Sequence, residues 1–430
     1  MEIFINPNRS DWSTILKRPL LENTELEPIV AGILQNVKEN GDKAVLEYCR
    51  KFDNPNIENL KVSQQEISVA ESLVSDKLKS AIKVAIANIT KFHERQEEIP
   101  SVTETLFGVK CWRKSVGIEK VGLYIPGGSA PLFSTILMLA IPAKIAGCKE
   151  IILCTPEGKT GSIHPAILYA AKQAGVTQIF KVGGAQAIAA MAYGTETIPQ
   201  VYKIFGPGNQ FVMKAKMMVS TQGVAIDMPD GPSEVMIVAD ETANPEFIAA
   251  DFLSQCEHGK DSQAILLTTS KRIAEETKNA VNAQMKVLKR NEIVDVSVKN
   301  SKIVVFDSQE EMVEMMNEYA PEHLILSVAN AFEFSKKVVN AGSVFLGNYS
   351  PESAGDYASG TNHTLPTNGY AKAYSGVSLD SFVRKITFQE VIPQGLTTLG
   401  PTIETMAEAE MLDAHKNAVS VRLRELRDKN

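Results

Sequence analysis

The chain has 430 residues with a hydrophobic fraction of 44%, and its formal net charge at pH 7 is −7. An acidic chain lacks the basic surface that attracts nucleic acid or anionic membranes, so we expect a small molecule or another protein chain as partner. A chain of this length exceeds what one hydrophobic core holds, so two or more domains are expected.

The N-terminal sequence has no apolar core of signal-peptide length. The longest apolar run, residues 136–143, is far shorter than the ~20 residues of a membrane span. The five cysteines show no CxxC spacing, which argues against a disulfide framework. We therefore expect a cytoplasmic protein that neither spans nor binds a membrane.

The N-terminal part predicts an arm followed by helices. Residues 1–20 have little periodicity, and apolar residues then recur at helical spacing over 27–52 and 63–98. From residue 116 the pattern changes to strand, glycine turn and helix, and it repeats. Strands are predicted at 117–125, 150–154, 178–182 and 201–205. Successive βα units of this kind indicate a parallel sheet with helices on both faces.

Glycine turns follow three of these strands, in the segments PGGSAP, VGGAQAIAA and FGPGN. A glycine turn that opens a helix directs free N–H groups and a partial positive charge at a phosphate, as dinucleotide binding requires. Such turns lie at the carboxyl edge of the sheet, where ligands bind. None of them is GxGxxG, so an ordinary tight βα turn remains the alternative.

A second α/β block begins at residue 235, after DMPDGPS. Its predicted strands are 235–240, 264–268, 303–306, 324–328 and 343–346, and its predicted helices include 245–257, 271–289 and 309–319. The polar stretch 350–367, SPESAGDYASGTNHTLPT, predicts an irregular loop. Long irregular segments inside a compact domain are typically either functional or disordered. After residue 376 the pattern is mostly helical.

These patterns predict an α/β fold with two Rossmann-like α/β/α domains and parallel sheets. An N-terminal arm and a helical C-terminal segment complete the chain. The predicted parts are the arm 1–20, a first α/β domain 21–123 and 235–376, a second α/β domain 124–234, and the C-terminal segment 377–430. The polar candidate residues below fall mainly in the first domain and the glycine turns in the second.

Gln255 and His258 stand at spacing i, i+3 in SQCEHG, so they share a face at a helix end. An amide oxygen and an imidazole, with the carboxylate of Asp356, would form a mixed site suited to Zn²⁺ or Mn²⁺. The alternative is a helix C-terminus at which His258 interacts with the helix dipole and Gly259 ends the helix.

Two further pairs combine a glutamate with a histidine. Glu322 and His323 are adjacent in APEHLIL, so both can point at one substrate only from an irregular junction. A histidine can accept a proton from an alcohol, and a glutamate can activate water. Glu410 and His415 would diverge on one helix, but a helix break near Met411 would let them converge. Two solvated residues on a polar helix face are the alternative there.

Taken together, the motifs resemble those of the histidinol dehydrogenase family over nearly the whole chain. They are LYIPGGSAPLFST, VGGAQAIAA, FGPGN, DMPDGPSEV, FLSQCEHG, YAPEHL, SPESAGDYASGTNHTLP and AEMLDAHKNAV. The resemblance implies a fold related to aldehyde dehydrogenases. It also implies a homodimeric zinc enzyme of histidine biosynthesis, which oxidises L-histidinol to L-histidinal and then to L-histidine with two NAD⁺.

By position, the resemblance implies particular roles for residues of this chain. The implied ligands of one Zn²⁺ per site, with Mn²⁺ as a substitute, are Gln255, His258, Asp356 and, across the dimer, His415. The implied NAD⁺ contacts are Tyr124, Gln186 and Asn209, and the implied catalytic pair is Glu322 and His323. The implied substrate contacts are Ser233, His363 and Glu410 together with Gln255, His258, His323, Asp356 and His415.

One departure from the family pattern is Cys256, where a small alanine is more usual. Beside metal ligands, this thiol could bind metal or respond to oxidation. Two other functions remain open at this stage. A zinc hydrolase would need a metal-bound water and a general base, but the HExxH motif is absent. A non-catalytic relative would bind metal or nucleotide without turnover.

Overall fold

The computed structural model describes residues 1–19, 26–127, 130–158, 161–229 and 231–428. It divides into two compact units, Met1–Gln96 with Ile118–Phe382, and Glu97–Gly117 with Val383–Asn430. Some residues of the sequence predictions lie outside the described ones. They are residue 20 of the arm, residues 21–25 of the first predicted domain, residues 159 and 160 of the second, and residues 429 and 430 of the C-terminal segment. Residues 128 and 129 of the turn 126–131 and residue 230 of the segment 227–233 also lie outside them. No described helix is long and apolar enough to cross a membrane.

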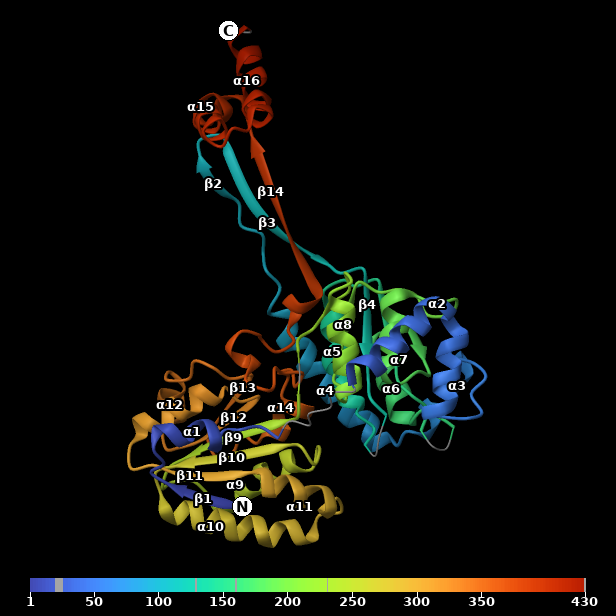
Figure 1. Cartoon of the computed structure of the whole chain (residues 1–430), viewed down its shortest axis with the longest axis vertical. Coiled ribbons are helices and arrows are strands. Elements are labelled where there is room, and N and C mark those ends of the chain that lie inside the picture. Colours follow the sequence, from blue (N-terminus) through green and yellow to red (C-terminus); the bar gives the residue numbers. More distant parts are fainter. Residues whose placement is uncertain (20–25, 128–129, 159–160, 230, 429–430) are drawn as a thin grey trace. The chain divides into compact units, whose positions relative to one another are not determined.

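The first unit contains a six-stranded parallel sheet with the order β1–β11–β10–β9–β12–β13 (Figure 1). The strands are β1 (Glu2–Ile5), β9 (Glu234–Ala239), β10 (Gln263–Thr268), β11 (Lys302–Val305), β12 (His323–Ser327) and β13 (Ser343–Leu346). Strands β9, β10 and β12 are buried at every position. Burial of whole strands is expected where helices cover both faces of a parallel sheet.

Helices cover both faces of this sheet. One face packs on α9 (Pro245–Cys256), α10 (Lys271–Gln284) and α11 (Asn291–Asn300), and the other on α1 (Trp12–Ile15), α12 (Gln309–Tyr319) and α13 (Ala331–Ser335). Along β9, Val235 and Ile237 join the first core and Met236 and Val238 the second. This alternation follows from the two-residue period of a strand. The sheet therefore separates two hydrophobic cores.

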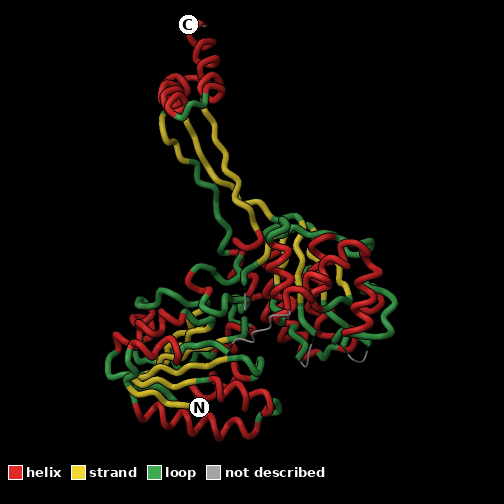
Figure 2. The backbone as a smooth tube through the Cα atoms, in the orientation of Figure 1, coloured by secondary structure: helices red, strands yellow, loops and turns green. Residues whose placement is uncertain are grey.

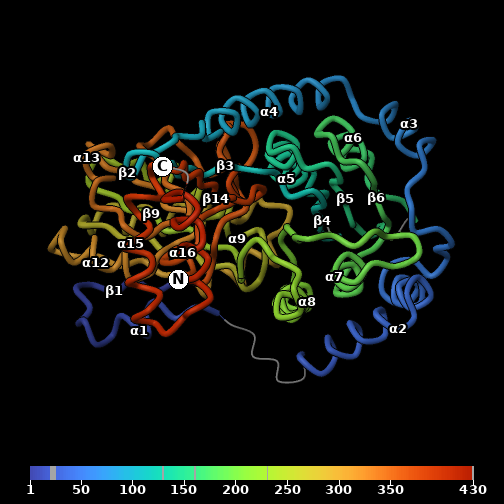
Figure 3. The backbone as a smooth tube through the Cα atoms, turned by 90° about the horizontal axis from the view of Figure 1, so that it is seen from above, coloured from blue at the N-terminus to red at the C-terminus, as the bar shows by residue number. Residues whose placement is uncertain are grey.

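A second parallel sheet in this unit has the order β6–β5–β4–β7–β8. Its strands are β4 (Lys120–Tyr124), β5 (Glu150–Cys154), β6 (Gln178–Phe180), β7 (Lys203–Phe205) and β8 (Ala225–Ile226). Figure 3 shows α5 (Phe133–Ile145) and α6 (Pro165–Ala174) on one face, and α7 (Gly184–Tyr193) and α8 (Gln210–Ser220) on the other. The chain runs outward from β4 to β6 and returns to β7 beside β4. This reversal makes a topological switch point, where ligands bind in such sheets.

The N-terminal helices pack differently from the sequence prediction, which grouped residues 21–123 with 235–376. Helix α2 (Leu26–Phe52) contacts α7 and α8, α3 (Gln64–Leu73) contacts α6, and α4 (Asp76–Glu94) contacts α5. These helices therefore cover the five-stranded sheet. The amphipathic pattern of these helices predicts that they cover a sheet. It does not predict whether that is the five-stranded or the six-stranded sheet, because long-range packing decides this. The arm supplies β1, which pairs in parallel with β11.

The second unit combines a three-stranded antiparallel sheet with two helices (Figure 2). Its elements are β2 (Thr103–Leu106), β3 (Val109–Gly117), β14 (Val383–Val391), α15 (Pro393–Ala409) and α16 (Asp413–Asp428). The expectation of mostly helical structure after residue 376 holds, and strand β14 is the part of this segment that it did not include. Its residues pair with β3 from Val383↔Gly117 to Val391↔Val109. The helical C-terminal part is thus confirmed from Pro393 onward.

Candidate active site

Glu322 and His323 lie at the junction between α12 and β12, at the amino edge of the six-stranded sheet. Helix α12 ends at Tyr319, and Ala320 has a left-handed conformation with φ 53°. Since β12 begins at His323, Glu322 precedes the regular strand, and the two side chains need not diverge. His323 Nδ1 lies 3.5 Å from Glu322 Oε2. The irregular junction that the sequence requires is therefore present.

Hydrogen bonds hold both side chains of this pair. Glu322 Oε2 accepts the backbone N–H of Glu234 at 2.8 Å and the side-chain Nε2 of Gln255 at 3.3 Å. His323 Nδ1 lies 3.3 Å from the carbonyl oxygen of Glu234. A carbonyl can only accept, so Nδ1 carries the proton in this contact and Nε2 holds the lone pair of the neutral ring. The first residue of β9 thus orients both members.

The amide of Gln255 has a defined direction, because its nitrogen donates to Glu322. Its Oε1 is buried, and no hydrogen-bond partner reaches it among the described residues. Buried polar atoms nearly always have a partner, so an exception calls for a ligand or an ion. The sequence predicted Gln255 as an oxygen donor to a metal, and the orientation of the amide is compatible with that role.

Asp356 brings the proposed metal site to the catalytic pair. Its Oδ1 lies 3.4 Å from His323 Nε2. The sequence predicted an irregular loop over 350–367, but the structure contains the short helix α14 (Glu352–Tyr357) there. Asp356 lies on this helix, so the loop prediction is wrong for its first part. The error arose because a single-turn helix in a segment rich in Gly, Ser and Pro has almost no periodic signal.

His363 lies in the irregular part that follows α14. Its Nδ1 is 2.8 Å from the backbone carbonyl of Asp356, and its Nε2 is 3.0 Å from the hydroxyl of Thr135 on α5. The carbonyl fixes the proton on Nδ1, so Nε2 accepts from the hydroxyl. Burial lowers the pKa of His363. A neutral imidazole is therefore held beside Asp356, in the position predicted for a substrate contact.

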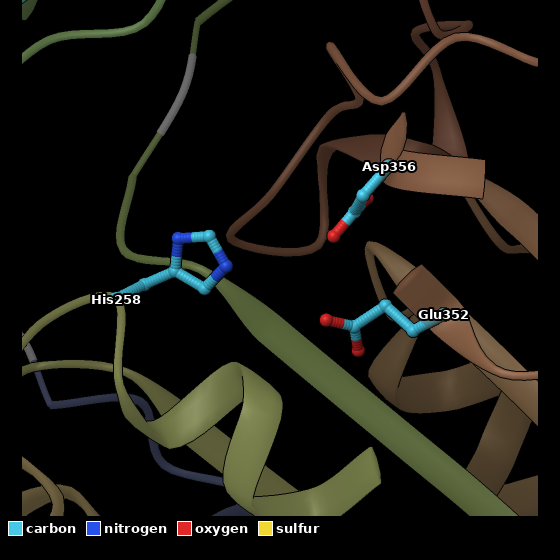
Figure 4. A group of neighbouring side chains, drawn as sticks. All are labelled: His258, Glu352 and Asp356. Carbon is cyan, nitrogen blue, oxygen red and sulfur yellow. The ribbon is translucent and has the colours of Figure 1, made fainter. Parts of the chain in front are cut away.

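Three donors converge beside this pair. In Figure 4 the side chains of His258, Glu352 and Asp356 point toward one another, and one donor atom of each lies within 4.8 Å of the others. Glu352 is fully buried and was not predicted as a site residue. It stands four residues before Asp356, so on α14 the two carboxylates share a face. That spacing would have identified Glu352 had the helix been predicted.

The electrostatics of the cluster reflect its excess of carboxylates. Burial lowers the pKa of His323, but Glu322 and Glu352 outweigh it and raise the pKa well above its usual range. Burial raises the pKa of Glu352, an effect that His323 opposes and the neighbouring carboxylates reinforce. Burial also acts to raise the pKa of Asp356, but hydrogen bonding and charge from His323 lower it overall. A cation would offset this negative charge.

Tyr124, Gln186 and Asn209 lie at the carboxyl edge of the five-stranded sheet, around its switch point. The hydroxyl of Tyr124 accepts the N–H of Gly184 at 3.0 Å, which fixes the start of α7. Gln186 is buried on α7, and no partner reaches its Nε2 among the described residues. Asn209 caps α8 by accepting the N–H groups of its first turn. The predicted NAD⁺ contacts are therefore parts of the turns themselves.

Gly206 connects two of these turns, because it follows β7 and lies against Tyr124. Its φ is 122°, and a Cβ at this position would lie 2.0 Å from the carbonyl oxygen of Tyr124. Only glycine fits such a position, since any side chain would clash with backbone. The FGPGN motif is therefore explained by a close backbone approach at the switch point.

The remaining predicted residues are Ser233, Glu410 and His415. Ser233 is half-buried directly before β9, and its carbonyl accepts the N–H of Gln263 at 3.1 Å. Glu410 and His415 are exposed residues of the second unit. They flank a break between α15 and α16, where Met411 has φ 58°. The predicted helix break near Met411 is thus confirmed, and the roles of the two side chains stay predictions.

Cys256 points into the core between α9 and α11. Its side chain is fully buried, and its Sγ lies 3.8 Å from the hydroxyl of Ser301. Burial raises the pKa of the thiol to about 11. The thiolate is the form that binds metal or reacts with oxidants, so this residue is poorly suited to either role. Cys256 is therefore a packing residue of the core on this face of the sheet.

Two parallel α/β layers, one with glycine turns at its switch point and one with a buried acid–base cluster, define an α/β fold of the aldehyde-dehydrogenase type. A family model described as histidinol dehydrogenase matches residues 16–423. The chain belongs to the histidinol dehydrogenase family.

Relatives support this assignment in sequence and structure. The chain is 60% identical to a histidinol dehydrogenase of Bacteroides thetaiotaomicron, covering 99% of this chain and 100% of the relative. It is 52% identical to one of Mannheimia succiniciproducens, covering 96% of each chain. The crystal structure of histidinol dehydrogenase from Elizabethkingia anophelis aligns with a TM-score of 0.97 at 55% identity over 99% of both chains.

A more remote structural neighbour shows the wider fold class. An acetylating aldehyde dehydrogenase from Geobacillus thermoglucosidasius aligns with a TM-score of 0.50 at 12% identity, covering 89% of this chain and 94% of that one. At this identity the likeness concerns the fold alone. It agrees with the predicted relation to aldehyde dehydrogenases.

Proposed function

We propose that the protein oxidises L-histidinol to L-histidine through L-histidinal, with two NAD⁺ and one Zn²⁺ per site. Family membership supports the substrate. The observation that carries the chemistry is the convergence of the pair Glu322 and His323 with the donors His258 and Asp356. An acid–base pair within contact distance of metal donors fits oxidation of an alcohol and hydration of the resulting aldehyde.

The donor set fits a zinc ion. It combines the unpartnered Oε1 of Gln255 with an imidazole from His258 and a carboxylate from Asp356. Nitrogen and oxygen donors of this kind suit Zn²⁺, with Mn²⁺ as a substitute. We assign these residues as ligands, with His415 of the partner subunit as the fourth. When bound, zinc acts as a Lewis acid that holds and polarises the substrate.

The turns around the switch point fit a dinucleotide. The first turns of α7 and α8 have N–H groups without intrahelical partners, and such helix starts favour phosphate. We assign Tyr124, Gln186 and Asn209 to NAD⁺ binding. The buried Nε2 of Gln186, which lacks a partner among the described residues, is a donor available for this role. NAD⁺, when bound, accepts hydride from the substrate.

The mechanism assigns the two proton transfers to different members of the pair. His323 holds its Nδ1 proton against the carbonyl of Glu234, so Nε2 is the atom that would accept the hydroxyl proton of L-histidinol. A bound cation would offset the carboxylate charge that raises the pKa of His323 and so favour the neutral ring that this step requires. Both hydrogen bonds to Glu322 fall on Oε2. We therefore assign Oε1 of Glu322 to the activation of water, which adds to the aldehyde carbon of L-histidinal. The resulting diol is the species that undergoes the second oxidation.

The second unit fits a role in a homodimer with shared sites. Among its described residues only Val109, Ala407 and Leu423 are buried apolar side chains, whereas Ile99 is 88% exposed and Met411 is 87% exposed. Exposed apolar surface on this scale marks a protein interface. A second copy of the chain covering this surface would receive Glu410 and His415 into its own site.

Formation of NADH from L-histidinol tests the proposal. Absorbance at the NADH band should rise only when both L-histidinol and NAD⁺ are present. A chelator should abolish the rise and added Zn²⁺ should restore it. A zinc hydrolase would produce no substrate-dependent NADH, and a non-catalytic relative would show no turnover, so a flat trace would overturn the assignment.

A further inference from the structure

We propose that Glu352 is a further metal donor, so that a single chain offers four donors to the ion before the partner's His415 takes part. The four are Gln255, His258, Glu352 and Asp356. This inference rests on the proposed metal site. It assigns that site an additional carboxylate, contributed by the same short helix as Asp356.

The first support is geometric. One donor atom each of His258, Glu352 and Asp356 lies within 4.8 Å of the others. Three donors spaced evenly around one ion, with bonds of ~2.1 Å each, lie ~3.4–3.6 Å apart. The donor atoms would therefore approach one another by about an ångström when the ion binds. Figure 4 shows both carboxylates of α14 directed toward the imidazole of His258.

The second support is independent of the first and concerns hydrogen bonding. Glu352 is fully buried, and its Oε1 lies 3.3 Å from the hydroxyl of Ser254. Among the described residues no partner reaches its Oε2. Gln255, which is 1% exposed, shows the same deficiency at its Oε1. Two buried oxygens without donors next to one cluster indicate a missing positive ligand, because buried acceptors are rarely left unpaired.

The third support is the sign of the charge around Glu352. The carboxylates of Asp356, Glu322 and Asp251 act on Glu352, and the imidazoles near it are those of His323 and His258. Among the described ion pairs none joins Glu352 to a lysine or arginine. A purely structural role would leave a buried acid among other acids, which is costly. A divalent cation resolves this arrangement, as paired carboxylates commonly do in oxygen-rich metal sites.

Four donors within one chain allow the ion to bind without the partner subunit. His415 of the partner subunit would then complete or exchange a position when substrate enters. Loss of the His415 imidazole should therefore weaken activity more than it weakens metal binding, whereas loss of the Glu352 carboxylate should weaken metal binding directly.

Zinc affinity measured without turnover tests this. Purified full-length wild type, Glu352→Gln, His415→Ala and His258→Ala are titrated with Zn²⁺ in competition with a chromophoric chelator, and Co²⁺ absorption spectra report the coordination. Glu275→Gln, at an exposed position of α10, is the matched control. We expect the Kd of Glu352→Gln to rise at least about tenfold, as for residues that support metal sites, with an altered Co²⁺ spectrum. His415→Ala should still bind one zinc per chain.

Each outcome has a distinct meaning. If Glu352→Gln binds zinc like wild type while His258→Ala does not, Glu352 is no donor and the proposed metal site still stands. If wild type binds no zinc, the proposed function is overturned as well. Thermal melting in chelator shows whether Glu352→Gln is folded. If Glu352→Gln is not folded, the zinc Kd of Glu352→Asp is measured instead, because this variant keeps the carboxylate but shortens the side chain by one methylene. A role as metal donor predicts a raised Kd for Glu352→Asp. A role in folding alone predicts an unchanged Kd.

Discussion

Nε2 of His323 lies 3.4 Å from Oδ1 of Asp356, which joins the first residue of β12 to the short helix α14. The proposed base and a proposed metal ligand thus share one contact. A cation bound to the Asp356 carboxylate would offset the negative charge that raises the pKa of His323. Metal binding and proton transfer are therefore expected to depend on each other.

Replacing Glu322 with glutamine should separate the two oxidations. The amide oxygen of Gln can still accept the backbone N–H of Glu234, so the fold should persist, but it cannot accept a proton from water. We expect oxidation of L-histidinal to slow by about a hundredfold or more, with a much smaller effect on L-histidinol. Single-turnover NADH formation from each substrate measures this. Equal loss in both reactions would contradict the division of roles.

Mixing two inactive variants should test whether the sites are shared. His258→Ala and His415→Ala each remove one proposed ligand, but a heterodimer would retain one intact site. We expect part of the wild-type activity to return after the subunits are dissociated, mixed and reassociated. Mass spectrometry should verify that heterodimers form. If they form and remain inactive, each site is contained within one chain.

Stability should depend on pH through Asp53, which lies just after α2. Burial raises the pKa of Asp53 to about 6, above an unfolded value of ~3.9. The protonated form is therefore favoured on folding, and its contribution is fully present below pH ~4 and lost as the pH rises through ~6. Asp53→Asn should be more stable than wild type at pH 8 by about 1–2 kcal/mol, since partial exposure reduces the effect.

Urea unfolding of both proteins across pH 4 to 8 measures the Asp53 effect. The stability difference should shrink toward pH 4, where the wild-type carboxyl is protonated in both states. A difference that stays constant over this range would show that the substitution acts through packing instead.

Gly206→Ala should displace the backbone at the switch point of the five-stranded sheet and weaken NAD⁺ binding. The new Cβ would lie 2.0 Å from the carbonyl oxygen of Tyr124, so the backbone of β4 or of the FGPGN turn must shift. We expect the KM for NAD⁺ to rise by about tenfold or more, because small displacements of a positioned turn are costly. Gly223→Ala is the matched control. Its φ is also positive, at 96°, but no atom lies within 4 Å of the new Cβ.

The control should lose only about 1 kcal/mol of stability through backbone strain and keep its affinity for NAD⁺. Steady-state kinetics and thermal melting measure both variants. A Gly206→Ala protein with wild-type KM and melting temperature would contradict the close approach at this turn.

Local patterns predicted the βα units well, and they placed Glu322, His323 and Gln255 at element ends where the structure has them. Two kinds of feature were not predicted from the sequence. The packing of α2 to α4 on the five-stranded sheet depends on long-range contacts that amphipathic patterns do not encode. The helix α14 spans Glu352–Tyr357, too few residues to show a helical period. Because that helix was not predicted, Glu352 was not identified as a site residue, although the sequence shows that it stands four residues before Asp356.

The contacts of Tyr124 and His363 could not have been predicted either. Tyr124 is the last residue of β4, and its hydroxyl accepts the N–H of Gly184 from a different βα unit. His363 reaches Thr135 on a helix of the other sheet. Both contacts join segments far apart in sequence, and only the folded chain brings them together.

The stoichiometry of NADH formation tests the central claim most directly. A limiting amount of L-histidinol is incubated to completion with excess NAD⁺ and zinc-loaded protein, and NADH and the amino-acid product are quantified. Two NADH and one L-histidine per L-histidinol are the predicted result. One NADH per L-histidinol with accumulation of the aldehyde, or no NADH at all, would contradict the account.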